Sequence, residues 1–175
     1  MRANADAERV RAVARELARV ARSDTTVYLT GGATAVIEGW RQSTVDIDLR
    51  LEPDSDQLLR RIAEVKNDLD VNIELASPPD FIPELPGWRD RSPFVLQEGR
   101  VTVRHFDPYS QALSKIERGF DLDRSDVEAM IDQELVEPGR LRELFDQIEP
   151  QLFRYPAIDA ADLRAKLDRT LTRTI

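Results

Sequence analysis

Residues 44–51 read Thr-Val-Asp-Ile-Asp-Leu-Arg-Leu, a strict alternation of polar and apolar side chains. A period of two predicts a β-strand that buries one face and leaves the other in polar surroundings. Asp46 and Asp48 share the polar face, because side chains two residues apart in a strand point to the same side. Their backbones lie about 6–7 Å apart, so both carboxylates can converge on one or two divalent cations. The alternative interpretation is the solvated face of an antiparallel strand.

A pair of glycines precedes this strand. Residues 27–29 form a short apolar run that stops at Gly31 and Gly32, as a strand that enters a tight turn does. We expect a second helix over residues 33–39, so that bare backbone N–H groups and a helix N-terminus can hold a phosphate. The alternative interpretation is a plain turn that needs glycine for its backbone conformation.

Two further side chains belong to this predicted phosphate site. Thr34 falls in the first turn of the expected helix and adds a hydroxyl. Arg41 follows the helix and either clamps a phosphate or pairs with Asp48.

A second alternating strand is expected from Val71 to Leu75, with Val71, Ile73 and Leu75 inward and Asn72 and Glu74 outward. Three carboxylates on adjacent strands, facing a glycine turn, would form a two-metal site that bridges nucleotide phosphates and activates an attacking hydroxyl. Glu74 therefore completes the second metal site or takes the proton of the acceptor hydroxyl. Its alternative is a solvent-facing strand residue.

Helices are expected before and after these strands. The predicted helices cover residues 7–21, a stretch from the cap at 53–56 to about Lys66, and residues 109–118, 124–133, 139–149 and 160–173. Five prolines between Pro78 and Pro93 predict an irregular loop, and residues 101–106 resume strand character, paired with residues 93–96. His105 is expected on the outward face of that strand, in a structural or surface role.

The composition limits the class of protein. The chain has 175 residues, which suit one domain or a domain with a small helical addition. Its 25 Lys and Arg against 33 Asp and Glu give a net charge of −8, which argues against a uniformly basic nucleic-acid-coating protein. The absence of cysteine excludes disulfides, thiolate zinc sites and cysteine nucleophiles, and a single histidine excludes multi-histidine metal sites. No apolar run approaches the roughly 18 residues that span a bilayer, so we expect a cytoplasmic protein without a membrane partner.

The order of the glycine pair and the aspartates carries a family resemblance. Residues 30–32 (Thr-Gly-Gly), followed after thirteen residues by residues 46–49 (Asp-Ile-Asp-Leu), resemble the signature of the nucleotidyltransferase superfamily. In that superfamily a Gly-Gly or Gly-Ser turn precedes an Asp-x-Asp or Asp-x-Glu strand, and a third acidic residue lies on a later strand. The resemblance implies that Glu74 is this third residue.

A narrower resemblance includes the helical region. The chain resembles the type IV abortive-infection toxins of toxin–antitoxin systems, the AbiEii/MenT group, in three segments: residues 41–48, 115–118 and 123–126. The resemblance implies that Lys115 donates to a phosphate and that Asp126, or else Asp123, lies near the substrate. The alternatives are an exposed helix lysine at Lys115 and a helix N-terminal cap at Asp126.

The same resemblance implies a reaction and its partners. The enzyme would transfer a nucleoside monophosphate from an NTP, with two Mg²⁺ ions, often to the 3′ end of tRNA, and a cognate antitoxin protein would accompany it. An arginine stripe in the N-terminal helix offers a local basic patch for RNA, at Arg9, Arg11, Arg15, Arg19 and Arg22.

These patterns predict an α/β (α+β) fold, with a nucleotidyltransferase-like core of a small mixed sheet and helices over residues 1–106 and a helical segment over 107–175 packed on it. The expected function is a metal-dependent nucleotidyltransferase that acts on RNA as the toxin of a toxin–antitoxin pair. Two alternatives are transfer to a small-molecule or protein hydroxyl, and an inactive module that binds a nucleotide or a cognate protein. The leucine-rich stripe of the last helices is expected to pack on the core or on a second copy of the chain.

Overall fold

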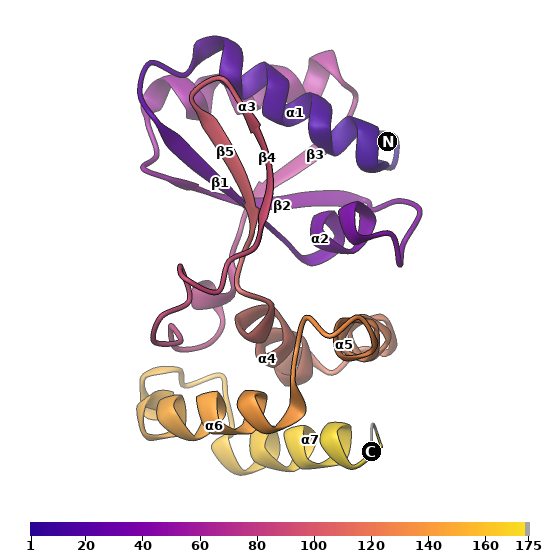
Figure 1. Ribbon diagram of the computed structural model, residues 1–175, viewed down its shortest axis with the longest axis vertical. Helices are drawn as coiled ribbons and strands as arrows, with labels where there is room; N and C mark the ends of the chain where they lie inside the picture. Colours follow the sequence, from indigo (N-terminus) through magenta and orange to yellow (C-terminus); the bar gives the residue numbers. More distant parts are fainter. Residues whose placement is uncertain (174–175) are drawn as a thin grey trace. The chain divides into compact units, whose positions relative to one another are not determined.

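The computed structural model describes residues 1–173 and shows a mixed sheet and a set of helices (Figure 1). Residues 174–175 of the predicted C-terminal segment lie outside the described residues. The strands are β1 (Thr25–Thr30), β2 (Asp46–Glu52), β3 (Asn72–Leu75), β4 (Phe94–Glu98) and β5 (Val101–His105). The α-helices are α1 (Ala7–Val20), α2 (Gly31–Glu38), α3 (Asp56–Asp68), α4 (Pro108–Arg118), α5 (Asp121–Asp132), α6 (Pro138–Ile148) and α7 (Ala160–Arg173). Two 3₁₀ helices are η1 (Pro78–Asp80) and η2 (Glu149–Arg154).

The chain divides into two compact units. The first, here called the sheet unit, consists of Met1–Ser77 and Ser92–Phe106 and holds all five strands with α1, α2 and α3. The second, here called the helical unit, consists of Pro78–Arg91 and the chain from Asp107 onward, and holds α4 to α7. Within residues 1–173 no helix has both the length and the apolar composition to cross a membrane.

The five-stranded sheet has the order β3-β2-β1-β5-β4. β1 lies in the centre, antiparallel to β2 and parallel to β5, while β3 runs parallel to β2 and β4 antiparallel to β5. The predicted fold class, a mixed sheet flanked by helices and followed by a helical segment, is therefore confirmed. The predicted pairing of the fourth and fifth strands is confirmed as well.

One face of the sheet is buried against α1 and α3, which lie side by side on it (Figure 1). The alternation in β2 explains this face, because Ile47, Leu49 and Leu51 point into the core while the residues between them stay partly exposed. The two helices contribute Leu17 of α1 and Ile62 of α3 among others. Burial of such side chains stabilises the unit by about 1.5–3 kcal/mol each.

Two local predictions in the sheet unit are wrong. Leu75 was expected to point inward, but its exposed fraction is 55%, because β3 is an edge strand that ends at this residue. The second helix was expected to follow the glycines from Ala33, but Gly31 is already its first residue. The glycine pair therefore forms the first turn of α2, where helical N–H groups lack intrahelical partners.

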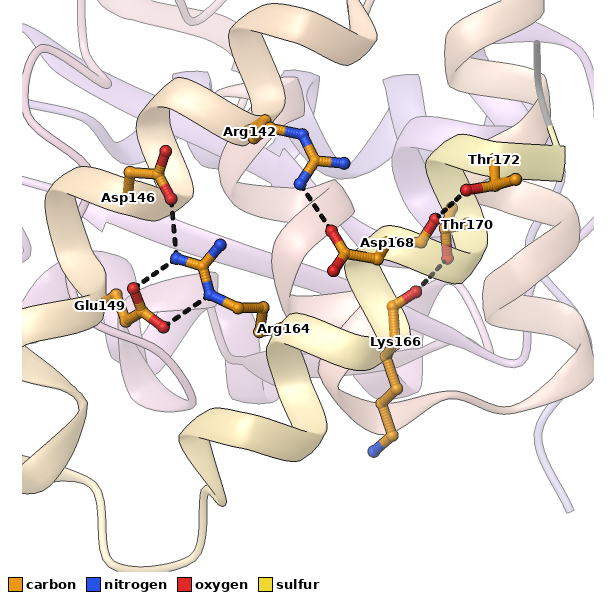
Figure 2. Close-up of polar contacts among 8 residues, drawn as sticks. All are labelled: Arg142, Asp146, Glu149, Arg164, Lys166, Asp168, Thr170 and Thr172. Atoms are coloured by element: carbon orange, nitrogen blue, oxygen red, sulfur yellow. Dashed lines mark hydrogen bonds and ion pairs between the residues drawn. The ribbon is translucent and has the colours of Figure 1, made fainter.

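In the helical unit, α6 and α7 are joined by ion pairs between their polar faces (Figure 2). Arg142 lies 2.5 Å from Asp168, and Arg164 contacts both Asp146 at 2.9 Å and Glu149. The Arg164 guanidinium lowers the pKa of the Glu149 carboxyl by hydrogen bonding to its charged form.

The leucine-rich stripe of the C-terminal helices is buried within the described chain. Its members are Leu141, Leu144, Phe145, Ile148, Leu152, Leu163, Leu167 and Leu171. The predicted helices at 109–118, 124–133, 139–149 and 160–173 are each found within a few residues of the expected bounds.

Candidate active site

One row of residues crosses the polar face of the sheet where β1 ends. Thr30 of β1 pairs with Asp48 of β2, and Asp48 pairs with Glu74 of β3. Residues in register on neighbouring strands lie about 4.7–4.9 Å apart and share a face. The structure thus places Asp48 beside the glycine turn and Glu74 beside Asp48 on the neighbouring strand. Asp46 and Asp48 are half-buried, and Glu74 is exposed.

Gly31 lies directly against the Asp48 carboxylate. A Cβ added to Gly31 would lie 2.9 Å from Asp48 Oδ2, closer than real Cβ atoms approach a neighbour. Its φ is +59°, in the left-handed region that favours glycine. The sequence therefore needs glycine here for two reasons, backbone conformation and space for a carboxylate.

Gly32 is packed against the segment that leads into β2. A Cβ on Gly32 would lie 2.0 Å from Thr44 Oγ1 and 3.5 Å from Arg41 Nη1. The guanidinium group of Arg41 therefore lies beside the glycine turn, where the sequence predicted a phosphate clamp. Thr30, the residue before α2, makes no side-chain cap to the helix, so a side-chain oxygen of Thr30 does not occupy the N–H groups of the first turn.

Asp46 is held on both its backbone and its side chain. Thr44 Oγ1 donates to the Asp46 carbonyl oxygen at 2.8 Å. The amide Nδ2 of Asn72, the residue in register with Asp46 on β3, donates to Asp46 Oδ1. Neither Thr44 nor Asn72 was predicted as a site residue. The signal for Asn72 was its shared outward parity with Glu74, but the cross-strand register that brings it to Asp46 is not readable from one sequence.

The carboxylates do not form a complete metal cage. Within residues 1–173 no three His, Asp or Glu side chains are grouped so that they could hold a metal ion by themselves. Mg²⁺ is usually held by one or two carboxylates together with substrate phosphates, and it keeps several waters. Asp46 and Asp48 lie on one strand face, with the Asp48 carboxylate against Gly31, and two such carboxylates fit this mode of binding. The role of Glu74 as a metal ligand stays a prediction.

The Thr34 hydroxyl forms contacts within the protein. Thr34 is buried, and its hydroxyl donates to the Leu29 carbonyl oxygen at 3.2 Å and lies 3.1 Å from His105 Nδ1. The predicted Thr34 hydroxyl is therefore used within the protein, where it ties α2 to the end of β1.

The predicted outward position of His105 is wrong. Residues 101, 103 and 105 share one parity, so His105 lies on the buried face with Val101 and Val103, and its exposed fraction is 2%. Nε2 lies 2.6 Å from Glu38 Oε1 on α2. Burial lowers the pKa of His105, while the Glu38 carboxylate acts in the opposite direction. The structural role that was expected is consistent with these contacts.

Lys115 and Asp126 meet inside the helical unit. Lys115 Nζ lies 2.5 Å from Asp126 Oδ2 and 3.6 Å from Asp123 Oδ1, and all three side chains are about 5% exposed or less. A lysine exposed on the helix surface is therefore excluded. The interpretation of Asp126 as an N-terminal cap is wrong as well, because α5 begins at Asp121 and Asp126 lies in its second turn. A phosphate contact by Lys115 stays a prediction.

The arginine stripe of α1 is partly neutralised by its own helix. Arg15 lies 2.5 Å from Glu8, and Arg19 lies 2.5 Å from Glu16. Such pairs reduce the positive potential that an RNA backbone would meet.

A glycine turn that ends one strand, two aspartates on the antiparallel neighbour and an acidic residue on the next strand define a nucleotidyltransferase core. The chain belongs to the family described as nucleotidyltransferase of unknown function (DUF6036), whose model matches residues 8–166. No curated protein and no solved structure gives a match. The family match supports the superfamily assignment, and the narrower resemblance to abortive-infection toxins stays a prediction.

The contact between Gly31 and Asp48 can be tested by Gly31→Ala, with Gly99→Ala as the matched control. Both glycines have a positive φ, +59° and +52°, so each alanine should cost about 1–2 kcal/mol of stability. A Cβ on Gly99 meets only Ala18 at 4.0 Å, whereas on Gly31 it displaces Asp48. We therefore expect Mn²⁺ affinity, measured by electron paramagnetic resonance in the presence of a non-hydrolysable NTP analogue, to fall at least about tenfold in Gly31→Ala and to stay unchanged in Gly99→Ala. Equal affinities in the two variants would contradict this account.

The buried ion pair in the helical unit predicts a large effect of Lys115→Met. The variant leaves Asp126 buried without its lysine, which should lower the free energy of unfolding by about 3–5 kcal/mol. The double variant with Asp126→Leu should recover most of this loss. Arg124→Ala, which breaks an exposed pair with Asp121, should cost about 1 kcal/mol or less. Urea unfolding measures all three, and a loss in Lys115→Met no larger than in Arg124→Ala would refute the structural role.

The buried His105 predicts a pH dependence of stability. Because its pKa in the folded protein is lowered from 6.5, the unfolded chain binds the proton more readily. Neutral His105 therefore contributes to the stability of the folded protein. This stability is fully present above about pH 6.5 and is lost as the pH falls from there through the lowered pKa. We expect the free energy of unfolding, measured with urea between about pH 8 and pH 5.5, to change less with pH in His105→Gln than in the wild type. His105 is the single histidine of the chain, so an identical pH dependence would count against the proposed burial.

Proposed function

We propose that the chain transfers a nucleoside monophosphate from an NTP to an acceptor hydroxyl in a Mg²⁺-dependent reaction. The observation that carries this proposal is the direct contact of Gly31 with the Asp48 carboxylate. Phosphates that bind the backbone of this turn would lie within reach of a metal ion on Asp48. The family match supports nucleotidyl transfer as the reaction class.

Asp46 and Asp48 would hold the two metal ions from the polar face of β2. Bound Mg²⁺ would neutralise the triphosphate charge and help pyrophosphate to leave. The protein side chains supply position rather than covalent chemistry, as expected for transfer of a phosphoryl centre.

Backbone and guanidinium groups would bind the triphosphate. We assign this binding to the backbone of Gly31 and Gly32 in the first turn of α2 and to Arg41, whose Nη1 lies beside Gly32. An arginine fork can donate two parallel hydrogen bonds to one phosphate. A phosphate contact by Lys115 would require its ammonium group to leave or share its ion pair with Asp126.

In the reaction the acceptor oxygen forms a bond to the α-phosphorus, and the bond from the α-phosphorus to the oxygen that bridges it to the β-phosphorus breaks. Pyrophosphate leaves with that electron pair, and the acceptor hydroxyl loses its proton. Glu74, exposed and in register with Asp48, is the carboxylate that we assign to accept this proton.

We propose RNA, with tRNA as the first candidate, as the acceptor, and a role as the toxin of a toxin–antitoxin pair. The support is the resemblance of residues 41–48 and of the segments around Lys115 and Asp126 to abortive-infection toxins. Arg11 of α1 and Arg22, two residues after its end, are exposed and would contact phosphodiesters.

The proposal predicts release of pyrophosphate when the protein is incubated with NTP, Mg²⁺ and bulk tRNA, and label from α-³²P NTP should appear in the RNA. Asp48→Asn should lower the rate at least about 100-fold, because even changes to residues that only support metal ligands cost 10- to 100-fold. Gln97→Ala, an exposed change on β4, is the control and should keep the wild-type rate.

Assays with different acceptors distinguish transfer to RNA from transfer to another hydroxyl and from an inactive binding module. Label in a small molecule or in protein would retain nucleotidyl transfer and replace RNA as the acceptor. Absence of transfer to every acceptor, with Asp48→Asn equal to the wild type, would leave a binding module. Expression in cells should arrest growth for the wild type and not for Asp48→Asn if the toxin role is right.

A further inference from the structure

Asp46 differs from Asp48 in how its carboxylate is held. Asp48 faces the backbone of Gly31, whereas Asp46 accepts a hydrogen bond from the Asn72 amide across the β2–β3 pair. The two residues are thus on one strand face but have different neighbours. This difference bears on how each would bind a metal ion.

The donor in this contact is fixed by chemistry. An ionised carboxylate only accepts hydrogen bonds, so the NH₂ group of Asn72 must face Asp46 and its carbonyl oxygen must face away. Asn72 and Asp46 are directly in register on parallel strands, which sets the direction of the amide. Asn72 is half-buried, so the hydrogen bond is partly shielded from water.

The hydrogen bond makes the two oxygens of Asp46 unequal. Oδ1 uses a lone pair for the amide, while Oδ2 keeps its full capacity for a cation. The amide restricts rotation of the Asp46 side chain, and the hydroxyl of Thr44, which donates to the Asp46 carbonyl oxygen, restrains its backbone. An oriented ligand binds a metal with less entropic cost than a mobile one.

The strands themselves are anchored close to this contact. Thr44 forms two backbone hydrogen bonds with Ala5, of 2.8 and 2.9 Å, and the backbone of Ala3 donates to the Asp70 carbonyl oxygen. The N-terminal segment therefore holds the start of β2 and the residues just before β3. Asp46 and Asn72 each lie two residues beyond one of these anchors, Thr44 and Asp70.

We propose that Asn72 is a positioning residue, which orients Asp46 so that Oδ2 is presented to a divalent cation at the nucleotide site. The inference rests on the proposed function for the identity of the site. It goes beyond that proposal in assigning to an amide side chain on β3 the control of metal affinity. Asn72 touches neither substrate nor the reacting atoms in this role.

The experiment measures Mn²⁺ binding by electron paramagnetic resonance in the presence of a non-hydrolysable NTP analogue. The variants are Asn72→Ala and Asn72→Leu, which both lack the donor, while Leu restores the lost volume. Both should weaken Mn²⁺ binding by about tenfold, within the 10- to 100-fold range known for residues that support metal ligands. The exposed change Leu75→Ala on the same strand is the matched control and should leave affinity unchanged.

A purely structural role of Asn72 predicts a different pattern. Asn72→Ala would then lower the unfolding temperature, Asn72→Leu would restore it, and Mn²⁺ affinity would not change in either variant. That result overturns the proposal. Wild-type protein that binds no Mn²⁺ at all also overturns it.

The readout separates this inference from the proposed function. If the wild type binds Mn²⁺ and the Asn72 variants bind it more weakly, the positioning role stands even when no nucleotide is transferred. If nucleotide is transferred and Mn²⁺ affinity is the same in wild type and variants, the proposed function stands and the role of Asn72 is refuted.

Discussion

The approach of the Gly31 backbone to the Asp48 carboxylate is the constraint on which the site depends. The antiparallel pairing of β1 with β2 puts the end of one strand beside the middle of the other, and glycine leaves the space that a side chain would fill. In the proposed function, phosphates bound at this turn would lie within reach of a metal ion held by Asp48. The side chains on the other face of β2 are buried under α1 and α3. The register of this strand therefore determines both which residues form the core and which form the site.

Within residues 1–173 no three acidic or histidine side chains are grouped to hold a metal ion by themselves, so in the proposed function the cation would be bound together with the nucleotide phosphates. A closed cage of protein ligands would bind a cation without substrate, whereas two aspartates leave coordination positions for phosphate oxygens. The pair of Lys115 and Asp126 has a structural role. It is a buried charge pair that the fold of the helical unit must keep intact, and removal of one partner is costly.

Much of the local structure could be predicted from the sequence because its periodicities are strong. The alternation at residues 44–51 and the helical stripes gave β2 and the C-terminal helices within a few residues, and the order of glycines and aspartates gave the superfamily. The predictions were wrong at positions whose burial or helix bounds depend on tertiary contacts. Leu75 stays exposed because its strand ends at a sheet edge, and Asp126 is inside α5 because the helix begins five residues earlier. His105 was misplaced although its parity with Val101 was readable. The contact of Asn72 with Asp46 could not be predicted, because it depends on the register of β2 and β3.

The central claim is that Asp46 and Asp48 hold a divalent cation opposite the glycine turn. Its most direct test is anomalous scattering from crystals soaked with Mn²⁺ and a non-hydrolysable NTP analogue. The account predicts manganese bound to oxygens of both aspartates, with the nucleotide phosphates at the backbone of Gly31 and Gly32. Manganese and nucleotide bound elsewhere, with the two carboxylates free of metal, would contradict it.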